Sequence, residues 1–536
     1  MFFGMHSEAV QVGQVRQMVL QRMVTYNGNG DNEGLYIRAS CRMKTEPGKI
    51  WVPKGGQIST DTYMNAFDLG AWRKYTDLTD FAFVWKICGK GKIRVLWEGK
   101  TDGIVSMAEL QAEGGREEIR HWVEGGRELQ DGFLYFAFRA EEESCLEAWI
   151  ETENAALREV HISLVICTYK RRGQLEGIID VLKAGKAETA EAEGGNGGTA
   201  GGREGRKGIG ENGWLEALVI DNASELEGGY GDGIVVFHNS NTGGSGGFAR
   251  GMEETVRRLG EYPATHVVLM DDDVVLQWES LCRLYALLSY VNAGYAEEAV
   301  AGRMFRMDRP GVQYTALEIW NGGDIRHVGW NRDMRERECL WDMNENRGGE
   351  YGGWWFACFP IGYVRENRPL PFFLHCDDAE YGLRHGGNPM ILNGIQVWHE
   401  TYEYRQSPVT AYYDFRNAMV VNAVAGNAGI GPEELWAKFF GKITDAHNRR
   451  DFLLEYFLIR AFRDFLKGRK WFMHKDDVRL HASLARKKKV SRYMNSFRWR
   501  TVYLVYRRKR RGWRKGKRKG TKAEKMEAEG QEMRTW

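Results

Sequence analysis

The stretch that most constrains this chain is His266 to Leu276, which reads HVVLMDDDVVL. An apolar run, Val267 to Met270, ends at three consecutive aspartates, Asp271 to Asp273. A buried strand that ends in carboxylates places negative charge at the carboxyl edge of a sheet, which is where ligands bind in open α/β sheets. Because adjacent carboxylates repel one another, the cluster favours a divalent cation that takes oxygen ligands. A solvated acidic turn after the strand is the alternative.

Composition indicates a folded chain of several domains. Of the 536 residues, 43% are hydrophobic and 12% aromatic, which is ample material for buried cores. None of the eight cysteines forms a C-x-x-C pair, so we expect reduced thiols rather than a zinc module or a redox dithiol. The N-terminus has no basic segment followed by an apolar one, and no run of about 18 apolar residues occurs. We therefore expect a cytoplasmic protein without a signal peptide or a transmembrane helix.

Residues 1–158 are expected to form an N-terminal β-sandwich. Short apolar or aromatic runs recur between glycine-containing breaks, a pattern typical of sandwiches and barrels. The runs are Leu35–Ile37, Ile50–Val52, Phe81–Ile87, Ile93–Trp97, Phe133–Phe138 and Cys145–Ile150. Such a domain serves either as a scaffold, for example in a homo-oligomer, or as a carbohydrate-contacting module, and the pattern leaves both open.

Residues 159–425 show an alternation of strands and helices that indicates a largely parallel sheet with helices on its faces. Buried strands are expected at Ile162–Cys167, Leu215–Ile220 and Ile234–Phe237, before the strand that ends at the aspartates. The stretch 184–212, rich in Gly, Glu and Ala, is expected to be a low-complexity surface insertion. The fold class predicted for this region is α/β.

Residues 426–504 are expected to be helical, and residues 505–536 form a basic tail. Between Arg507 and Lys522 lie eleven Lys or Arg residues and no acid, whereas the whole chain has a net charge of +2. Anionic lipid headgroups attract such a segment by about 1 kcal/mol per charge near the surface. We therefore expect the protein to associate peripherally with the inner face of the cell membrane. Nucleic acid would also attract the tail, but we do not expect a nucleic-acid partner. A solvated tail without a partner is the alternative.

The three aspartates suit an enzyme that transfers a sugar from a nucleotide donor, because such an enzyme must neutralise the departing diphosphate. Asp271 and Asp273 point to the same side of an extended segment, where they can hold one Mn²⁺ or Mg²⁺. Asp272 points to the other side and is expected to be structural or to contact the donor sugar. His399 in VWHETY can add an imidazole ligand, which suits Mn²⁺ better than Mg²⁺, or can be a structural histidine.

A second acidic pair, Asp377 and Asp378 in HCDDAEYGLR, can supply a general base for an acceptor hydroxyl. A neighbouring carboxylate raises the pKa of such a group above its ordinary value of about 3.9, which makes it a better base. The alternative is an acidic first turn that stabilises a helix N-terminus. Trp354 and Trp355 offer a flat apolar surface to a sugar ring, or else they pack in the core.

A glycine-rich loop, Asn241 to Gly251, opens a helix whose N-terminus favours phosphate. Gly243 and Gly244 allow the backbone to approach a ligand closely, although a glycine-rich loop alone is a weak signal. Arg171, in the turn after the first strand of the α/β region, can reach the base or a phosphate of a nucleotide donor.

Seven segments follow one another in the order CTYKR, DNAS, NTGGSGGFARG, MDDD, GGWW, DDAEYGLR and WHE. With these segments the chain resembles the galactofuranosyltransferases of glycosyltransferase family 2, and among them the enzymes that polymerise cell-wall galactan. The motifs cover residues 160–425. The resemblance implies a GT-A catalytic domain, which is a Rossmann-like nucleotide-sugar domain, between an N-terminal β-sandwich and a C-terminal helical region.

The resemblance also implies an activity and its residues. The activity is the inverting, metal-dependent transfer of galactofuranose from UDP-galactofuranose to a hydroxyl of a glycan or lipid-linked glycan, in cell-surface polysaccharide synthesis. Asp378 matches the catalytic base of the family, and Asp271, Asp273 and His399 match its metal ligands. The donor pocket corresponds to Arg171, Asn241, Gly243, Gly244 and Asp272, and the acceptor site to Trp354, Trp355, Asp377 and Glu318.

Three features depart from the family. His375 stands where the family polymerase has Lys, Asp414 stands in place of an acceptor-site His, and the insertion 184–212 has no counterpart. The two substitutions lie on the acceptor side, so the acceptor, the linkage and the number of sugars added stay open. Two other functions also stay open: a family 2 transferase with another nucleotide sugar, such as a rhamnosyl donor, and a non-catalytic carbohydrate-binding scaffold.

Overall fold

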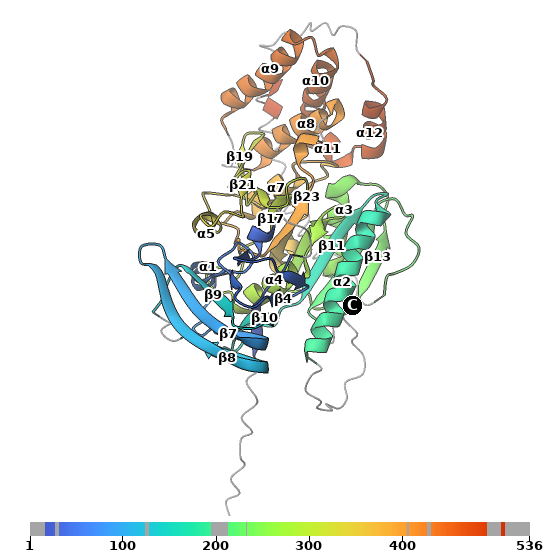
Figure 1. Ribbon diagram of the computed structural model, residues 1–536. Helices are drawn as coiled ribbons and strands as arrows, with labels where there is room; N and C mark the ends of the chain where they lie inside the picture. The colour runs from blue at the N-terminus through green and yellow to red at the C-terminus, as the bar shows by residue number, and fades with distance from the viewer. Residues whose placement is uncertain are drawn as a thin grey trace, which may run out of the picture. The chain divides into compact units, whose positions relative to one another are not determined.

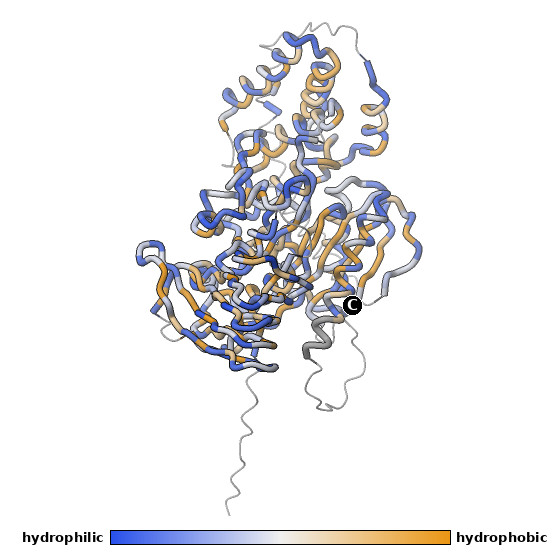
Figure 2. The backbone as a smooth tube through the Cα atoms, in the orientation of Figure 1, coloured by the Kyte–Doolittle hydropathy of each residue, from blue (hydrophilic) through white to orange (hydrophobic). Residues whose placement is uncertain are grey.

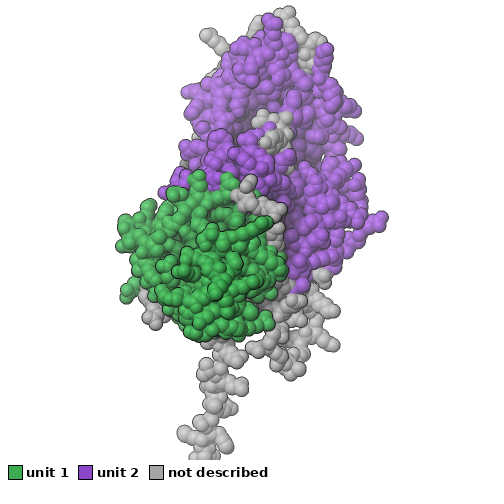
Figure 3. All heavy atoms as spheres, viewed as in Figure 1, with its two compact units in different colours: residues 1–159, 281–294, 335–341 green, residues 160–280, 295–334, 342–536 purple. Residues whose placement is uncertain are grey.

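The computed structural model describes residues 17–26, 32–123, 128–193, 213–231, 233–404, 407–425, 430–489, 505–506 and 508–509. The chain divides into two compact units, coloured separately in Figure 3. Unit 1 comprises Met1–Glu159, Leu281–Gly294 and Arg335–Trp341, and unit 2 comprises Val160–Ser280, Tyr295–Met334 and Asp342–Trp536. Two short segments of the predicted α/β range therefore cluster with the N-terminal unit.

Unit 1 is built around one antiparallel sheet of ten strands. Its longest strands, β7 (Ala82–Gly99) and β8 (Gly103–Trp122), pair along almost their whole length. On its other side β7 pairs first with β10 (Ser144–Thr152) and then with β9 (Phe133–Ala140). The remaining strands are β1 (Met18–Arg22), β2 (Arg38–Ala39), β3 (Lys44–Glu46), β4 (Lys49–Val52), β5 (Gln57–Ser59) and β6 (Phe67–Asp68).

Most of the predicted strands of unit 1 are present, and two details of the prediction are wrong. The runs Phe81–Ile87 and Ile93–Trp97 belong to the single strand β7, which continues through a bulge at Gly89. The run Leu35–Ile37 is not a strand, because a 3-10 helix, η1 (Glu33–Leu35), forms there. Strand β8 escapes the sequence pattern because only one of its residues is buried and its apolar residues do not alternate with polar ones. A division of this sheet into the two layers of a sandwich stays a prediction.

Two helices pack in unit 1 through buried polar groups. Asp68 caps α1 (Leu69–Tyr75) by accepting a hydrogen bond from the backbone N of Ala71 at 2.7 Å. The residues of α4 (Trp278–Tyr290) from Leu281 onward also belong to this unit. On α4 the fully buried Arg283 donates to the carbonyl oxygens of Met64 and Arg22, which explains why α4 clusters with the N-terminal strands.

Unit 2 contains the predicted α/β arrangement. Its six-stranded sheet has the order β13-β12-β11-β14-β22-β16, in which the first four strands are parallel and the last two pair antiparallel. Helices α2 and α3 lie beside this sheet in Figure 1, and its strands are hydrophobic in Figure 2, as parallel strands covered on both faces require. The elements are β11 (Ile162–Thr168), α2 (Arg172–Glu193), β12 (Leu215–Asp221), β13 (Ile234–His238), α3 (Gly243–Arg257), β14 (His266–Asp271), β16 (Val300–Ala301) and β22 (Ala357–Pro360).

The predicted insertion 184–212 is partly a helix, because α2 continues to Glu193. The Ala, Glu and Lys residues that made this stretch look like low-complexity sequence are also strong helix formers. The glycine-rich part, 194–212, lies outside the described residues.

The carboxyl ends of the parallel strands meet at one edge, because Cys167 on β11 is in register with Asp271 and Thr168 with Asp221. A second sheet of unit 2, β15-β23-β17-β18-β21, adjoins this edge through β15, which begins just after the aspartates and pairs with β23. This pairing brings the end of β23 to the end of β14. The elements are β15 (Val275–Leu276), β17 (Arg303–Arg306), β18 (Val312–Thr315), β21 (Arg332–Asp333) and β23 (Gln396–His399).

From Pro408 onward the described residues are mainly helical and share one apolar cluster. Tyr506, inside the predicted basic tail, is buried against Trp436, Phe462 and Phe465 of this cluster. Among the described residues no helix is both long and apolar enough to span a membrane. The helices are α8 (Pro408–Val424), α9 (Pro432–Asn448), α10 (Phe452–Leu466), α11 (Arg469–His474) and α12 (Asp477–Ala485).

Candidate active site

The three predicted metal ligands come together at the carboxyl edge of the parallel sheet. One ligand atom from each of Asp271, Asp273 and His399 lies within 4.8 Å of the others. The Nε2 atom of His399 is 3.0 Å from Asp273 Oδ1 and 3.7 Å from Asp271 Oδ2, although 126 residues separate it from Asp273. The pairing of β15 with β23 makes this approach possible.

The donor atoms of this cluster fit a divalent cation. Two carboxylates and one imidazole nitrogen at these separations can reach a single ion, and the mixed oxygen and nitrogen set suits Mn²⁺. His399 is buried, so its ring is held with Nε2 toward both aspartates. The fit supports the predicted role of the three residues as ligands, and the identity of the ion stays a prediction.

Arg171 lies against the same acidic stretch. Its Nη1 atom donates to Asp272 Oδ1 at 3.1 Å and to Asp273 Oδ2 at 2.7 Å. Asp272 is buried, and burial raises its pKa while hydrogen bonds from Thr168 and Arg171 act in the opposite direction. These contacts are compatible with the structural role that is one of the two expected for Asp272. Contact of Arg171 or Asp272 with a donor stays a prediction.

The predicted donor loop lies at the N-terminus of α3. Asn241 Oδ1 accepts a hydrogen bond from the backbone N of Gly243, whose φ of +72° favours glycine. A Cβ atom on Gly243 would lie 2.0 Å from the carbonyl oxygen of Phe373, whereas one on Gly244 would meet no described atom within 4 Å. Gly243 thus permits close contact with the segment before the second acidic pair, and Gly244 leaves the backbone open to a ligand.

Asp377 and Asp378 begin α7 (Asp377–His385), directly after two residues with left-handed backbone, His375 and Cys376. Burial and the charge of Asp378 raise the pKa of Asp377 to about 7, and burial also raises the pKa of Asp378. The backbone N of Ala379 donates to Asp378 Oδ1 at 2.7 Å. The pair therefore lies at a helix N-terminus, and the pKa of each carboxyl group is raised, which is the direction that strengthens a general base.

Glu318 lies close enough to Asp378 for the charge of Asp378 to affect its pKa. It is buried on β19 (Glu318–Asn321), where its Oε2 atom is 2.7 Å from Nδ1 of His327. Burial raises the pKa of Glu318 to about 7 against the effect of His327, and the charge of Asp378 adds to the increase. Its predicted contact with an acceptor stays a prediction.

The two residues that depart from the family pattern contact each other. His375 Nδ1 lies 2.5 Å from Asp414 Oδ1. Burial lowers the pKa of His375, but its hydrogen bond to Asp414 and the charges of Asp414, Asp377 and Asp378 outweigh burial, so the pKa is raised. The raised pKa favours the protonated form of His375 beside the acidic pair.

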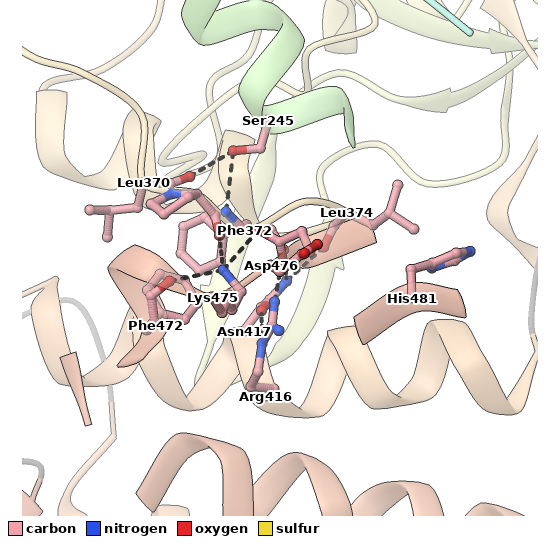
Figure 4. Close-up of polar contacts among 12 residues, drawn as sticks. Ser245, Leu370, Phe372, Leu374, Arg416, Asn417, Phe472, Lys475, Asp476 and His481 are labelled. Carbon is pink, nitrogen blue, oxygen red and sulfur yellow. Dashed lines mark hydrogen bonds and ion pairs between the residues drawn. The ribbon is translucent and has the colours of Figure 1, made fainter. Parts of the chain in front are cut away.

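The segment 370–376, which precedes the acidic pair, is held by buried polar side chains of α8 (Figure 4). Asn417 Nδ2 donates to the carbonyl oxygens of Leu374 at 2.6 Å and His375 at 2.9 Å. Arg416 Nη2 donates to the carbonyl oxygen of Phe372 at 2.8 Å. Because Arg416 and Asn417 are fully buried, these bonds form where water does not compete.

The segment 370–376 also accepts hydrogen bonds from side chains outside α8. Ser245 on α3 donates to the carbonyl oxygen of Leu370 at 2.6 Å, and Lys475 donates to that of Pro371 at 2.5 Å. Figure 4 shows the segment between the helix that carries Ser245 and the helix that carries Arg416 and Asn417. The donor loop and α8 thus fix the backbone that leads into Asp377.

Trp354 and Trp355 are buried, with 4% and 2% of their surface exposed. The ring of Trp354 packs edge-on against Phe248 and Tyr381, and Trp355 Nε1 donates to the carbonyl oxygen of Gly302 at 2.9 Å. In this structure both rings are core side chains, which is the alternative that the sequence left open. Their contact with an acceptor stays a prediction.

Sequence patterns do not single out Arg416, Asn417 and Lys475. The available signal was the pair of polar residues in AYYDFRNAMVV, because a polar side chain on a buried helix requires a partner. No local pattern marks Lys475, since the carbonyl group it binds lies 104 residues away.

Comparison with known proteins agrees with the resemblance. Residues 216–342 match the family described as "Glycosyltransferase like family 2", and residues 22–152 match "Galactofuranosyltransferase 2 N-terminal". Galactofuranosyltransferase GlfT2 of Mycobacterium tuberculosis is 25% identical over 445 residues, which are 77% of this chain and 65% of that protein. GlfT2 of Mycolicibacterium smegmatis is 23% identical over 440 residues, 77% of this chain and 64% of that protein.

The chain thus spans less than two thirds of the length of these curated relatives. Among solved structures, a mutant of the carbohydrate-binding module CBM29-2 covers 26% of this chain and 92% of its own, at 13% identity and a TM-score of 0.18, which is too low to indicate a shared whole-chain fold. The match to the family 2 domain implies a GT-A fold for the sheet that carries the aspartates. By these matches the chain is similar to glycosyltransferase family 2 over residues 216–342 and to the GlfT2 galactofuranosyltransferases over most of its length.

Proposed function

We propose that the protein is an inverting, metal-dependent glycosyltransferase that moves galactofuranose from UDP-galactofuranose to a hydroxyl of a glycan or lipid-linked glycan. One observation carries the proposal: unit 2 holds both a possible cation site and a separate pair of carboxyl groups with raised pKa. A non-catalytic scaffold has no need of this combination. The similarity to GlfT2 supports galactofuranose as the transferred sugar.

The donor side of the site consists of Asp271, Asp273, His399 and the N-terminus of α3. A divalent cation held by the first three would neutralise charge on the diphosphate of the donor. The backbone at Gly243 and Gly244 would approach the phosphates, which the helix N-terminus favours. Arg171 would be shared between Asp272, Asp273 and the nucleotide.

Asp378 takes the proton of the acceptor hydroxyl in this proposal. As that oxygen forms its bond to the anomeric carbon, the bond from this carbon to the diphosphate oxygen breaks and the nucleoside diphosphate leaves. A single displacement of this kind inverts the anomeric configuration. The positive charge of His375 beside the pair favours the ionised carboxylate and lets it act as a base.

Product analysis with a panel of glycan and lipid-linked acceptors tests the proposal, with UDP-galactofuranose and a rhamnosyl nucleotide compared as donors. We expect a galactofuranosylated product and release of UDP only with the first donor. Asp378→Ala should abolish transfer and retain UDP binding, while Asp445→Ala, which removes an exposed aspartate on α9, should retain both. Turnover of the rhamnosyl donor alone, or full activity of Asp378→Ala, would reject the assignment.

The cation site has a test that does not depend on turnover. Titration of the full chain with Mn²⁺, followed by electron paramagnetic resonance of the free ion, should show one site. Asp271→Ala and His399→Ala should each weaken binding at least tenfold, and Asp445→Ala should not. Equal Mn²⁺ binding by all the variants would remove the cation from the proposal.

A further inference from the structure

Unit 2 contains a cavity of about 220 Å³ that is lined by none of the residues assigned above to the donor, the cation or the base. Its walls include Arg303 of β17, Gln313 of β18, Arg332 of β21 and the turn that carries Trp330. At roughly 30 Å³ for each water molecule, the cavity has room for several. It is smaller than the roughly 300 Å³ at which pockets for drug-sized ligands begin, and its size suits a single sugar ring.

The cavity and the cation site lie on opposite faces of the same sheet. His399 on β23 is in register with Arg306 of β17, and the cavity residue Arg303 is in register with Gln396. Side chains three positions apart on a strand point to opposite faces. The cavity is therefore a second site, separated from the reaction centre by the sheet that carries His399.

The inner wall of the cavity is polar and ordered. Arg303 is buried, and its Nη2 atom donates to Asn344 Oδ1 at 2.9 Å. Its Nη1 atom is 2.5 Å from Gln313 Oε1, and Gln313 Nε2 donates to the carbonyl oxygen of Gly329 at 2.8 Å. Planar groups fixed in this way offer hydrogen bonds in set directions, as recognition of sugar hydroxyls requires.

The outer wall of the cavity carries arginine and acidic side chains whose charges largely cancel. It also carries one hydrogen-bond donor that has no partner among the described residues. Arg332 and Arg347 both pair with Asp342, at 3.2 Å and 3.0 Å, and Arg347 also pairs with Glu345. The Nε–H group of Arg332 is buried and has no hydrogen-bond partner among the described residues. Since a buried donor without a partner destabilises the fold, a ligand oxygen at this position would remove that destabilisation.

Trp330 supplies an exposed aromatic ring to the wall of the cavity, beside buried apolar residues such as Val328 and Met334. It lies in the turn before β21, and 58% of its surface is exposed, more than for any other tryptophan among the described residues. An exposed indole beside fixed planar polar groups is the combination that binds the apolar face of a sugar ring while its hydroxyls are hydrogen bonded.

We propose that this cavity is a second glycan-binding site, which holds one sugar ring of the acceptor away from the reaction centre. That the bound glycan is the acceptor rests on the proposed function, whereas binding of a sugar here does not. Held in this way, a long acceptor presents its end to the catalytic site at a raised effective concentration, and a short acceptor gains nothing. A neutral glycan fits better than an anion, because Asp342 and Glu345 already offset two of the three arginines.

Saturation-transfer NMR on the full chain, without donor, tests the binding. The probes are a galactofuranosyl oligosaccharide and, separately, inorganic phosphate. We expect saturation of ring protons in the wild type and about tenfold weaker binding in Trp330→Ala, with binding retained in Trp330→Phe, which keeps an aromatic face. Val478→Ala, at an exposed apolar residue of α12, is the control and should bind as the wild type does.

Kinetics separate this proposal from the proposed function. Trp330→Ala should lower the ratio of kcat/KM for long acceptors to that for the shortest acceptor about tenfold, mainly through KM, and Val478→Ala should not change it. If the wild type is active and Trp330→Ala changes neither this ratio nor the binding of the oligosaccharide, the second site is overturned. The proposed transferase function would then still stand. Displacement of the oligosaccharide by phosphate at equal concentration would show an anion site instead. An inactive wild type that still binds sugar through Trp330 would overturn only the proposed function.

Discussion

His375 and Asp414 are joined by a hydrogen bond of 2.5 Å between Nδ1 and Oδ1, although they lie 39 residues apart. The bond links α8 to the backbone that leads into Asp377 and Asp378. Each of the two residues departs from the pattern that the resemblance implies. Their hydrogen bond raises the pKa of His375 and so favours a positive charge next to the acidic pair.

The first prediction concerns that charge. Because the folded pKa of His375 is raised above its ordinary value of about 6.5, its stabilising contribution is fully present below that pH and is lost as the pH rises through the folded pKa. Asp414→Asn should lower the pKa of His375, measured by NMR titration, and should cost less than ~1 kcal/mol at pH 5, since the pair is partly exposed. Asp445→Asn is the control. An unchanged titration of His375 would contradict the role of Asp414.

The second prediction concerns Glu318. With its folded pKa raised to about 7, the folded chain holds a proton that the unfolded chain releases at lower pH, so stability falls as the pH rises from about 4.3 to 7. Glu318→Gln should therefore stabilise the protein by about 1–3 kcal/mol at pH 8 and have little effect near pH 4, as measured by urea unfolding. Glu433→Gln, at an exposed residue, should show no such pH dependence. An equal effect at both pH values would show that Glu318 is not the titrating group.

A matched pair of glycines gives the third prediction. Gly243→Ala would force a Cβ atom to 2.0 Å from Phe373 O in a backbone conformation with φ +72°, so we expect a loss of at least ~2 kcal/mol in the free energy of unfolding. Gly244→Ala meets no described atom within 4 Å and should change stability by about 0.5 kcal/mol or less. Thermal unfolding of the two variants measures the difference, and equal melting temperatures would contradict the contact.

The fourth prediction tests the hydrogen bonds that Asn417 donates to the segment 370–376, before the acidic pair. Asn417→Ala leaves the carbonyl groups of Leu374 and His375 without this donor and should cost about 1–3 kcal/mol. If these hydrogen bonds position Asp378, kcat should also fall more than tenfold, while KM for the donor should change little. Asn422→Ala, which removes a bond to Ala418 O within α8 and one from Trp320 Nε1, is the control for stability alone. A similar fall in kcat for both variants would assign the effect to helix packing.

The fifth prediction concerns the basic tail, most of which lies outside the described residues. Tyr506 packs in the helical cluster, so removal of 505–536 would damage the fold. A chain that ends after Lys509 keeps Tyr506 and loses eight of the eleven clustered basic residues. It should bind anionic liposomes at least tenfold more weakly in a sedimentation assay, since each charge contributes up to about 1 kcal/mol, and show no change with neutral liposomes. Unchanged binding to anionic liposomes would contradict the predicted association of the tail with a membrane.

Local sequence was sufficient wherever a pattern and its structure occupy the same stretch. The apolar run before Asp271 predicted a buried strand with carboxylates at its end, and the glycine-rich loop predicted the start of α3, because periodicity and glycine content act within a few residues. Local sequence failed where the signal was weak. Strand β8 has one buried residue and no apolar alternation, and residues 184–193 look like low-complexity sequence although they continue a helix.

The sequence by itself determined the resemblance to a family and the candidate ligand types, because side-chain chemistry and motif order are properties of the chain. Only the tertiary structure decided which groups meet and in what environment. It brought His399 to Asp273 across 126 residues and His375 to Asp414 across 39, and it buried Trp354 and Trp355. It also raised the pKa values of Asp377 and Glu318, because desolvation depends on everything packed around a carboxyl group and no short stretch of sequence contains that information.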